Sequence, residues 1–230
     1  MKKLVMFDVD GTLTDTTQLD SECFVAAVTE VTGFSDISGD WTDYTHVSDA
    51  GVIHEVYERR AKRRPTGQEI QAVQDVFFAI LKDRMMADPD CCREVPGAGK
   101  LIAALRSEKD VIVAIATGGW GTSAVMKLTH AGIDISGLPF ANANHFIARV
   151  NIMRQAQRLA LATIGESCLE TVEKIYVGDG LWDVRASRTL GSRLIGIGDG
   201  NLGSMLEAEG VDPILNSYEP LEAVLKLIGV

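Results

Sequence analysis

Short apolar runs alternate with longer amphipathic stretches along most of the chain. Five runs of about three to six residues predict β-strands, and most of them end at an acidic, glycine or threonine residue; they are 3–7, 111–116, 174–177, 193–197 and a weaker 213–215. Such short, nearly continuous apolar runs are typical of a parallel sheet that is buried on both faces. The stretches between them predict helices, so the pattern indicates an α/β fold with a Rossmann-like parallel sheet.

About a hundred residues separate the first two predicted strands, far more than one crossover requires. Apolar residues recur at helical spacing in three parts of this interval, 19–33, 49–63 and 66–86, and helix 97–107 then leads into the second strand. We therefore predict a helical cap over 16–90, inserted into a catalytic core made of 1–15 and 91–230. Ligands of open α/β sheets bind at the carboxyl ends of the strands, so we expect the site there.

Composition and charge narrow the class of protein. The 230 residues carry a formal net charge of −10, which gives no basic surface for nucleic acid and would repel an anionic membrane. The basic run 59–64 is interpreted as a solvated helix end. The apolar run before the first aspartate is too short for a signal peptide, and no stretch is long enough to cross a membrane, so a cytoplasmic location is expected.

Cysteine and histidine patterns suggest no metal site of the zinc type. The four cysteines have no C-x-x-C spacing and are expected to be reduced and packed; they are Cys23, Cys91, Cys92 and Cys168. The four histidines are scattered. His46, in a polar and aromatic loop of the predicted cap, is a candidate for substrate recognition, although that loop could equally cap the helix that follows it.

The first predicted strand is followed directly by the sequence Asp8-Val9-Asp10-Gly11-Thr12. Its two carboxylates lie two residues apart, project to the same side, and would repel each other unless a cation lay between them. An all-oxygen site of this kind favours Mg²⁺. Gly11 permits an unusual backbone close to a phosphate, and the Thr12 hydroxyl can donate a hydrogen bond there. The alternative is an ordinary turn, because Asp and Gly are common turn residues.

This sequence resembles the nucleophile motif of the haloacid dehalogenase superfamily, most of whose members are phosphatases. Two further motifs follow in the family's order. Ala114-Ile115-Ala116-Thr117-Gly118-Gly119 resembles the strand whose threonine and following amide hold the phosphoryl group, and Gly178-Asp179-Gly180-Leu181-Trp182-Asp183 resembles the metal-binding motif. Taken singly, the first could be a plain strand-to-turn transition, and the second a turn aspartate followed by a helix cap that holds no Mg²⁺.

One element of the family pattern is missing. The resemblance implies a lysine at the start of a helix before the last acidic motif, and no lysine occurs between Lys127 and Lys174. We expect Arg149 to replace it, because a guanidinium binds phosphate oxygens in a bidentate manner. Arg154 and Arg158 are rivals on the same predicted helix, one turn or more from its start.

The resemblance covers nearly the whole chain and is nearest to the phosphoglycolate-phosphatase-like branch with a helical cap. It implies a Mg²⁺-dependent phosphatase of a small phosphorylated metabolite, with Asp8 as nucleophile through an aspartyl-phosphate and Asp10 as general acid and base. It implies Mg²⁺ ligands from Asp8, the Asp10 carbonyl, Asp179 and Asp183. A β-phosphoglucomutase-like mutase and a phospho-accepting regulatory module without turnover remain alternatives, and the sequence does not determine the oligomeric state.

Overall fold

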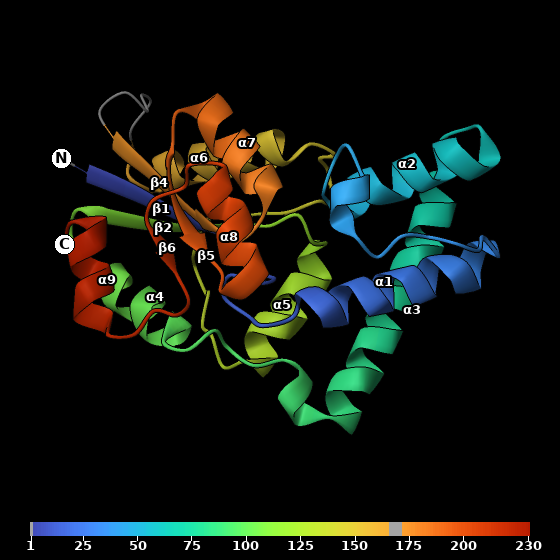
Figure 1. Ribbon diagram of the computed structural model, residues 1–230, viewed down its shortest axis with the longest axis horizontal. Coiled ribbons are helices and arrows are strands. Elements are labelled where there is room, and N and C mark those ends of the chain that lie inside the picture. Colours follow the sequence, from blue (N-terminus) through green and yellow to red (C-terminus); the bar gives the residue numbers. More distant parts are fainter. Residues whose placement is uncertain (1, 166–171) are drawn as a thin grey trace.

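The computed structural model describes residues 2–165 and 172–230. Its six strands form one parallel sheet in the order β3-β2-β1-β4-β5-β6, with β1 at the centre between β2 and β4 (Figure 1). The strands are β1 (Lys2–Phe7), β2 (Val111–Ala116), β3 (Phe140–Ala141), β4 (Val172–Gly178), β5 (Arg193–Ile197) and β6 (Ile214–Leu215). The predicted α/β fold with a Rossmann-like parallel sheet is confirmed.

Helices cover both faces of the sheet. The helices of the described residues are α1 (Thr17–Thr32), α2 (Asp49–Ala61), α3 (Gly67–Ala87), α4 (Ala98–Ser107), α5 (Gly121–His130), α6 (Arg149–Thr163), α7 (Leu181–Leu190), α8 (Gly200–Ala208) and α9 (Leu221–Ile228), of which the first three lie outside these two layers. In β1 the side chains alternate: Leu4 and Met6 face the cluster that includes α6, while Val5 and Phe7 face the cluster that includes α4 and α9. Burial on both faces explains why the central strands are continuously apolar.

Helices α1, α2 and α3 follow one another between β1 and α4, and in Figure 1 they lie beyond the sheet, on the side away from both chain termini. Local sequence sets their bounds. Gly33 takes a left-handed conformation with φ of 69° and ends α1, and Thr66 with Glu69 forms a capping box that begins α3. The predicted helices therefore match the observed ones within about two residues.

Aromatic packing joins these helices to the sheet. Phe24 of α1 and Phe77 of α3 pack against Trp120, which precedes α5 and is fully buried. Each ring pair lies at a centroid distance of 5.6 or 5.7 Å, and such contacts add to the free energy gained by apolar burial. No helix within the described ranges is long and apolar enough to span a membrane.

The cysteines whose placement is described carry free thiols. Cys23 and Cys92 are buried and Cys91 is half-buried, in agreement with the expected packed, reduced state. Cys168 lies outside the described residues.

Candidate active site

Asp8 lies directly after β1, at the carboxyl edge of the central strand, and is buried. Its Oδ1 accepts a hydrogen bond from the backbone N–H of Val9 at 2.8 Å, and its Oδ2 accepts one from Arg149 Nη1 at 2.9 Å. Burial raises the pKa of Asp8, while the Arg149 guanidinium acts in the opposite direction. The carboxylate is thus oriented by two donors in a site protected from water.

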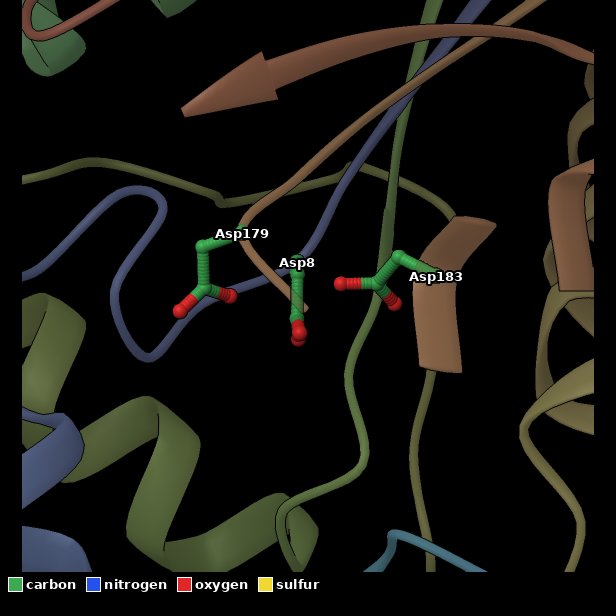
Figure 2. A group of neighbouring side chains, drawn as sticks. All are labelled: Asp8, Asp179 and Asp183. Carbon is green, nitrogen blue, oxygen red and sulfur yellow. The ribbon is translucent and has the colours of Figure 1, made fainter. Parts of the chain in front are cut away.

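Three acidic side chains converge at this edge of the sheet. Asp179 follows β4, Asp183 lies in the first turn of α7, and Figure 2 shows both beside Asp8. One carboxylate oxygen from each lies within 4.8 Å of the others. Burial and mutual repulsion raise the pKa of Asp179 well above its ordinary value, and burial raises that of Asp183 to about 7.

This acidic trio, Asp8, Asp179 and Asp183, fits a hard divalent cation. Asp183 is fully buried, and its Oδ1 has no hydrogen-bond partner among the described residues. Its other oxygen, Oδ2, accepts a hydrogen bond from the Gly180 N–H at 3.1 Å. Arg149 Nε, at 3.6 Å, offsets part of the charge on Oδ1 without donating a hydrogen bond to it, and Mg²⁺ prefers such buried oxygen ligands.

Gly11 allows the turn after β1 to pass close to the acidic trio. Its φ is +70°, and a Cβ atom there would lie 2.1 Å from Oδ2 of Asp179. Gly11 therefore has the predicted unusual backbone conformation, and any side chain at this position would clash with Asp179. Thr12 is fully buried and its Oγ1 lies 3.4 Å from Asp179 Oδ1, so its hydroxyl faces the acidic trio and does not line the cavity described below.

The loop after β2 carries Thr117, Gly118 and Gly119, all of which line the same cavity as Asp8. The Gly119 N–H donates to Thr117 Oγ1 at 3.1 Å, which tightens the turn. A Cβ atom on Gly118 would lie 2.7 Å from Arg149 Nη2, so glycine at this position leaves room for the guanidinium. The second predicted motif therefore meets the first at one cavity.

Arg149 is the first residue of α6, as expected for the basic residue at a helix start. It is buried, contacts Asp8, and its Nε lies 3.6 Å from Asp183 Oδ1. The rivals Arg154 and Arg158 are exposed on the same helix. Geometry therefore favours Arg149, whose role in catalysis stays a prediction.

Replacing Arg149 with methionine is expected to lower kcat/KM for phosphomonoester hydrolysis by about a hundred- to a thousandfold, the usual cost of removing one donor that stabilises transition-state charge. Arg149→Lys should recover part of this loss, because it restores charge without the planar fork. Arg154→Met, on the exposed face of α6, is the matched control and should retain full activity. Equal losses in both methionine variants would contradict the assignment.

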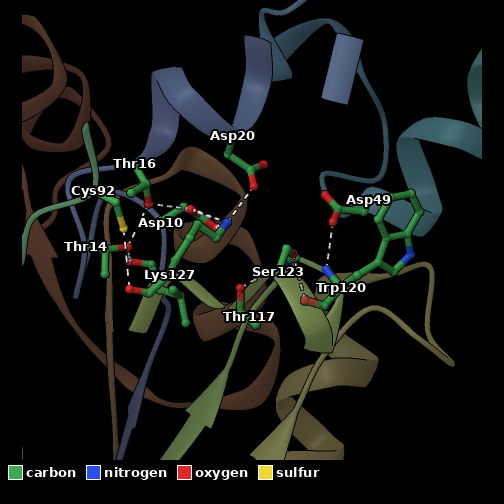
Figure 3. A network of polar contacts seen from close by, with 12 residues as sticks. Asp10, Thr14, Thr16, Asp20, Asp49, Cys92, Thr117, Trp120, Ser123 and Lys127 are labelled. Carbon is green, nitrogen blue, oxygen red and sulfur yellow. Dashed lines mark hydrogen bonds and ion pairs between the residues drawn. The ribbon is translucent and has the colours of Figure 1, made fainter. Parts of the chain in front are cut away.

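Asp10 is held by a lysine that the sequence did not point to. Lys127 of α5 is fully buried, and its Nζ lies 2.5 and 2.6 Å from the two Asp10 oxygens and 2.5 Å from Asp20 Oδ1 of α1 (Figure 3). Thr16 Oγ1 also donates to Asp10, at 2.6 Å. Two carboxylates from different parts of the chain therefore share one buried ammonium.

The residues that could bind a ligand surround one cavity with an empty volume of about 450 Å³. Its walls come from the loops after β1, β2 and β4, from the starts of α6 and α7, and from the segment that holds α1 and α2; they are Asp8, Asp10, Thr17, Asp20, Trp41, Val47, Ser48, Asp49, Val52, Thr117, Gly118, Gly119, Arg149, Asp179 and Trp182. His46 is not among them. It is exposed and lies in a separate depression with His54 and Glu55, so the structure does not bring it to the candidate site.

The affinity of the metal-free protein for Mg²⁺ is expected to rise with pH, by up to about tenfold per pH unit below the Asp183 pKa of about 7. Mg²⁺ must displace the proton from Asp183, so binding is weaker wherever that carboxyl is protonated.

The same raised pKa makes the metal-free fold lose stability as pH rises from about 4 towards 7, because the folded state binds the proton more tightly than the unfolded state.

Calorimetric titration of Mg²⁺ at pH 6, 7 and 8 checks this expectation. Asp183→Asn should weaken binding and flatten its pH dependence, whereas Asp199→Asn, an exposed carboxylate after β5, should leave both unchanged. A Mg²⁺ affinity in the wild type that does not change between pH 6 and 8 would contradict the assignment of Asp183 as a ligand.

Comparison with solved structures shows the same fold over the full length of the chain. A hydrolase from Pseudomonas syringae matches with 17% identity and a TM-score of 0.73, covering 100% of both chains. CbbY from Rhodobacter sphaeroides, in complex with phosphate, matches with 23% identity and a TM-score of 0.66, covering 96% of each chain. A predicted phosphoglycolate phosphatase from Haemophilus somnus matches with 17% identity and a TM-score of 0.63, covering 97% of each.

A search of the curated proteins finds no match. The family model described as haloacid dehalogenase-like hydrolase matches residues 2–191, a range that contains every residue of the candidate site. The chain therefore belongs to the haloacid dehalogenase-like hydrolase family.

Proposed function

We propose that this protein is a Mg²⁺-dependent phosphatase that hydrolyses a small phosphomonoester through an aspartyl-phosphate on Asp8. The observation that carries the proposal is the position of Asp8: it is buried at the end of the central strand, beside a guanidinium and two further carboxylates, in the wall of a cavity. A carboxylate fixed beside a cation site and a guanidinium is placed to attack a bound phosphoryl group.

Asp8, the main-chain carbonyl of Asp10, Asp179 and Asp183 would hold the Mg²⁺. When bound, the ion would neutralise the acidic trio and the developing charge on the phosphoryl oxygens. The Oδ1 of Asp183 supports this ligand set, because it accepts no hydrogen bond among the described residues and its charged neighbour, Arg149 Nε, lies 3.6 Å away.

In the first step Asp8 Oδ attacks phosphorus in line, the bond from phosphorus to the ester oxygen breaks, and Asp10 gives the leaving alkoxide a proton. In the second step the oxygen of a water molecule attacks phosphorus while Asp10 takes a proton from that water. The bond between phosphorus and Asp8 breaks, which frees the Asp8 carboxylate and inorganic phosphate. Thr117, the Gly118 N–H and Arg149 would stabilise the equatorial oxygens throughout.

We propose that residues 16–90 act as the cap and that 1–15 with 91–230 form the catalytic core. Support comes from direct contacts between the two parts near the cavity: the Asp49 N–H donates to Gly118 O at 2.8 Å, and Ser48 Oγ donates to Ile147 O at 2.6 Å. Such contacts would hold the cap over the loops that carry the phosphoryl group and would exclude bulk water.

Release of inorganic phosphate from a panel of phosphomonoesters, with Mg²⁺ and with EDTA, tests the proposal. Steady, Mg²⁺-dependent release supports a phosphatase. Conversion of a sugar phosphate to its isomer with little release would favour the β-phosphoglucomutase-like alternative, and a long-lived phosphorylated protein without turnover would favour a regulatory module. Panel members should include p-nitrophenyl phosphate, sugar phosphates, phosphoglycolate and nucleotides.

A further inference from the structure

The wall that the inserted segment 16–90 gives to the cavity is acidic and aromatic. Asp20, Asp49 and Trp41 come from this segment, and Trp182 of α7 joins them. Both carboxylates are buried, with exposed fractions of 5% and 6%. Of the described residues that line this cavity, Arg149 is the one lysine or arginine, and it is engaged with Asp8.

Asp49 has a free acceptor at the cavity. Its Oδ2 accepts a hydrogen bond from the Trp120 N–H at 2.7 Å, and this is the one hydrogen bond found for its carboxylate among the described residues, so Oδ1 can accept from a ligand in the cavity. The Asp49 N–H is bonded to Gly118 O, so the carboxylate is fixed next to the loop that carries Thr117. A nine-tenths buried carboxylate with an unused oxygen is therefore positioned beside the phosphoryl site.

The charges around Asp49 favour a cation. The single Lys127 ammonium is shared by Asp10 and Asp20, and Asp49 has no ion-pair partner in the described part of the chain. Burial, followed by repulsion from Asp20, raises the pKa of Asp49. A positive ligand group would relieve this repulsion, whereas a carboxylate or a second phosphate would add to it.

The aromatic residues of the wall suit the same ligand. Trp41 and Trp182 each line the cavity and the adjoining groove, so they flank the route by which the non-phosphate end of a substrate extends from Asp8. Indole rings attract ammonium groups through their π-electron faces, and carboxylates supply the counter-charge. The Arg149 guanidinium already lies over the Trp182 ring, 6.0 Å from its centroid, so Trp41 is the indole that suits a ligand ammonium. A glycolate or second phosphate group would find neither attraction.

We propose that the alcohol part of the substrate carries an ammonium group, bound by Asp49 with Trp41 beside it, so that the substrate is a small aminoalkyl phosphomonoester. This inference rests on the proposed phosphatase function and specifies the substrate class of the same site. It runs against both a phosphoglycolate substrate and a bisphosphate intermediate of the mutase type.

Three substrates of nearly equal size and different charge test the proposal on the wild-type protein: 2-aminoethyl phosphate, propyl phosphate and phosphoglycolate. We expect kcat/KM to fall in that order, with the ammonium substrate at least about tenfold better than its neutral isostere, a modest value for a desolvated ion pair. A preference for propyl phosphate, phosphoglycolate or a hexose phosphate over 2-aminoethyl phosphate would overturn the inference.

The variant Asp49→Asn then tests whether Asp49 causes the preference for the ammonium substrate. Asparagine keeps an oxygen for the Trp120 N–H and loses the charge, and the ratio of kcat/KM for 2-aminoethyl to propyl phosphate should fall towards one. The ratio cancels any general loss of activity. Asp43→Asn, an exposed carboxylate of the same segment that does not line the cavity, is the matched control and should keep the wild-type ratio.

The outcomes separate this inference from the function on which it rests. Hydrolysis of p-nitrophenyl phosphate that depends on Asp8, together with a ratio near or below one in the wild type, overturns the substrate class alone. A ratio that Asp49→Asn leaves unchanged removes Asp49 from recognition. Absence of hydrolysis for every phosphomonoester overturns the proposed phosphatase function, and the substrate inference with it. Because the wild-type series needs no variant, poor folding of Asp49→Asn would not prevent a decision.

Discussion

Replacing Asp8 with asparagine is expected to lower phosphatase activity by at least about a thousandfold, equivalent to about 4 kcal/mol in activation free energy. An amide is not a nucleophile towards phosphorus, so the covalent route through an aspartyl-phosphate is lost. The substitution is nearly isosteric, and the amide oxygen can still accept the hydrogen bond from the Val9 N–H.

The fold of the Asp8→Asn variant should remain intact. In the metal-free protein the substitution removes one negative charge from the buried acidic trio, where burial already raises the pKa of Asp8. We therefore expect the metal-free melting temperature to stay level or to rise, and stabilisation by Mg²⁺ to shrink. The measurements are phosphate release and thermal unfolding, each with and without Mg²⁺.

Asp110→Asn is the matched control for this prediction. Asp110 is exposed and directly precedes β2, at the edge of the sheet opposite to Asp8, so its substitution should leave activity within about twofold of the wild type. Retention of more than a tenth of the wild-type activity by Asp8→Asn would remove Asp8 as the nucleophile and with it the proposed mechanism.

The central sheet could be predicted from sequence because its strands are buried on both faces. Strands 111–116 and 193–197 were predicted at their observed bounds, since continuous apolar runs end sharply at polar loops. The edge strand β3 was missed. It has only two residues, Phe140 and Ala141, and two residues carry no periodicity that could mark a strand.

The three motifs converge because parallel strands bring their carboxyl ends to one edge of the sheet. Asp8, Thr117 and Asp179 follow β1, β2 and β4, which are adjacent in the sheet, so sequence order together with fold class predicted their proximity. The position of His46 could not be predicted in this way, because it belongs to an irregular loop whose course no periodic pattern determines.

Lys127 and Asp20 were missed although the sequence carries a signal for each. Lys127 lies on the stripe of α5 that buries Ala124 and Leu128, and Asp20 lies on the stripe of α1 that buries Cys23, Phe24 and Ala27. A charged residue in an apolar stripe must be paired, because an isolated buried charge is too costly. The sequence does not show which residues pair with each other, because Asp10, Asp20 and Lys127 come together only in the folded chain.

Replacing Lys127 with methionine is accordingly expected to destabilise the fold by about 3–5 kcal/mol, the usual cost of removing one partner from a buried ion pair. Methionine nearly fills the volume of the lysine stem, so the loss comes chiefly from the buried Asp20 carboxylate and the half-buried Asp10 carboxylate, which would both lack a counter-charge. Urea unfolding of the wild type and the variant at neutral pH measures the difference in the free energy of unfolding, provided that both proteins unfold with the same m-value.

Two further variants distinguish this explanation from a general packing defect. Lys3→Met removes a comparable short contact, Lys3 Nζ to Glu173 Oε2 at 2.5 Å, but there both side chains are partly exposed, so we expect a loss below about 1 kcal/mol. Adding Asp20→Asn to Lys127→Met should recover part of the lost stability, because it removes one of the two uncompensated carboxylates. If the double variant is no more stable than Lys127→Met alone, the uncompensated charge of the Asp10 and Asp20 carboxylates is not the cause of the loss.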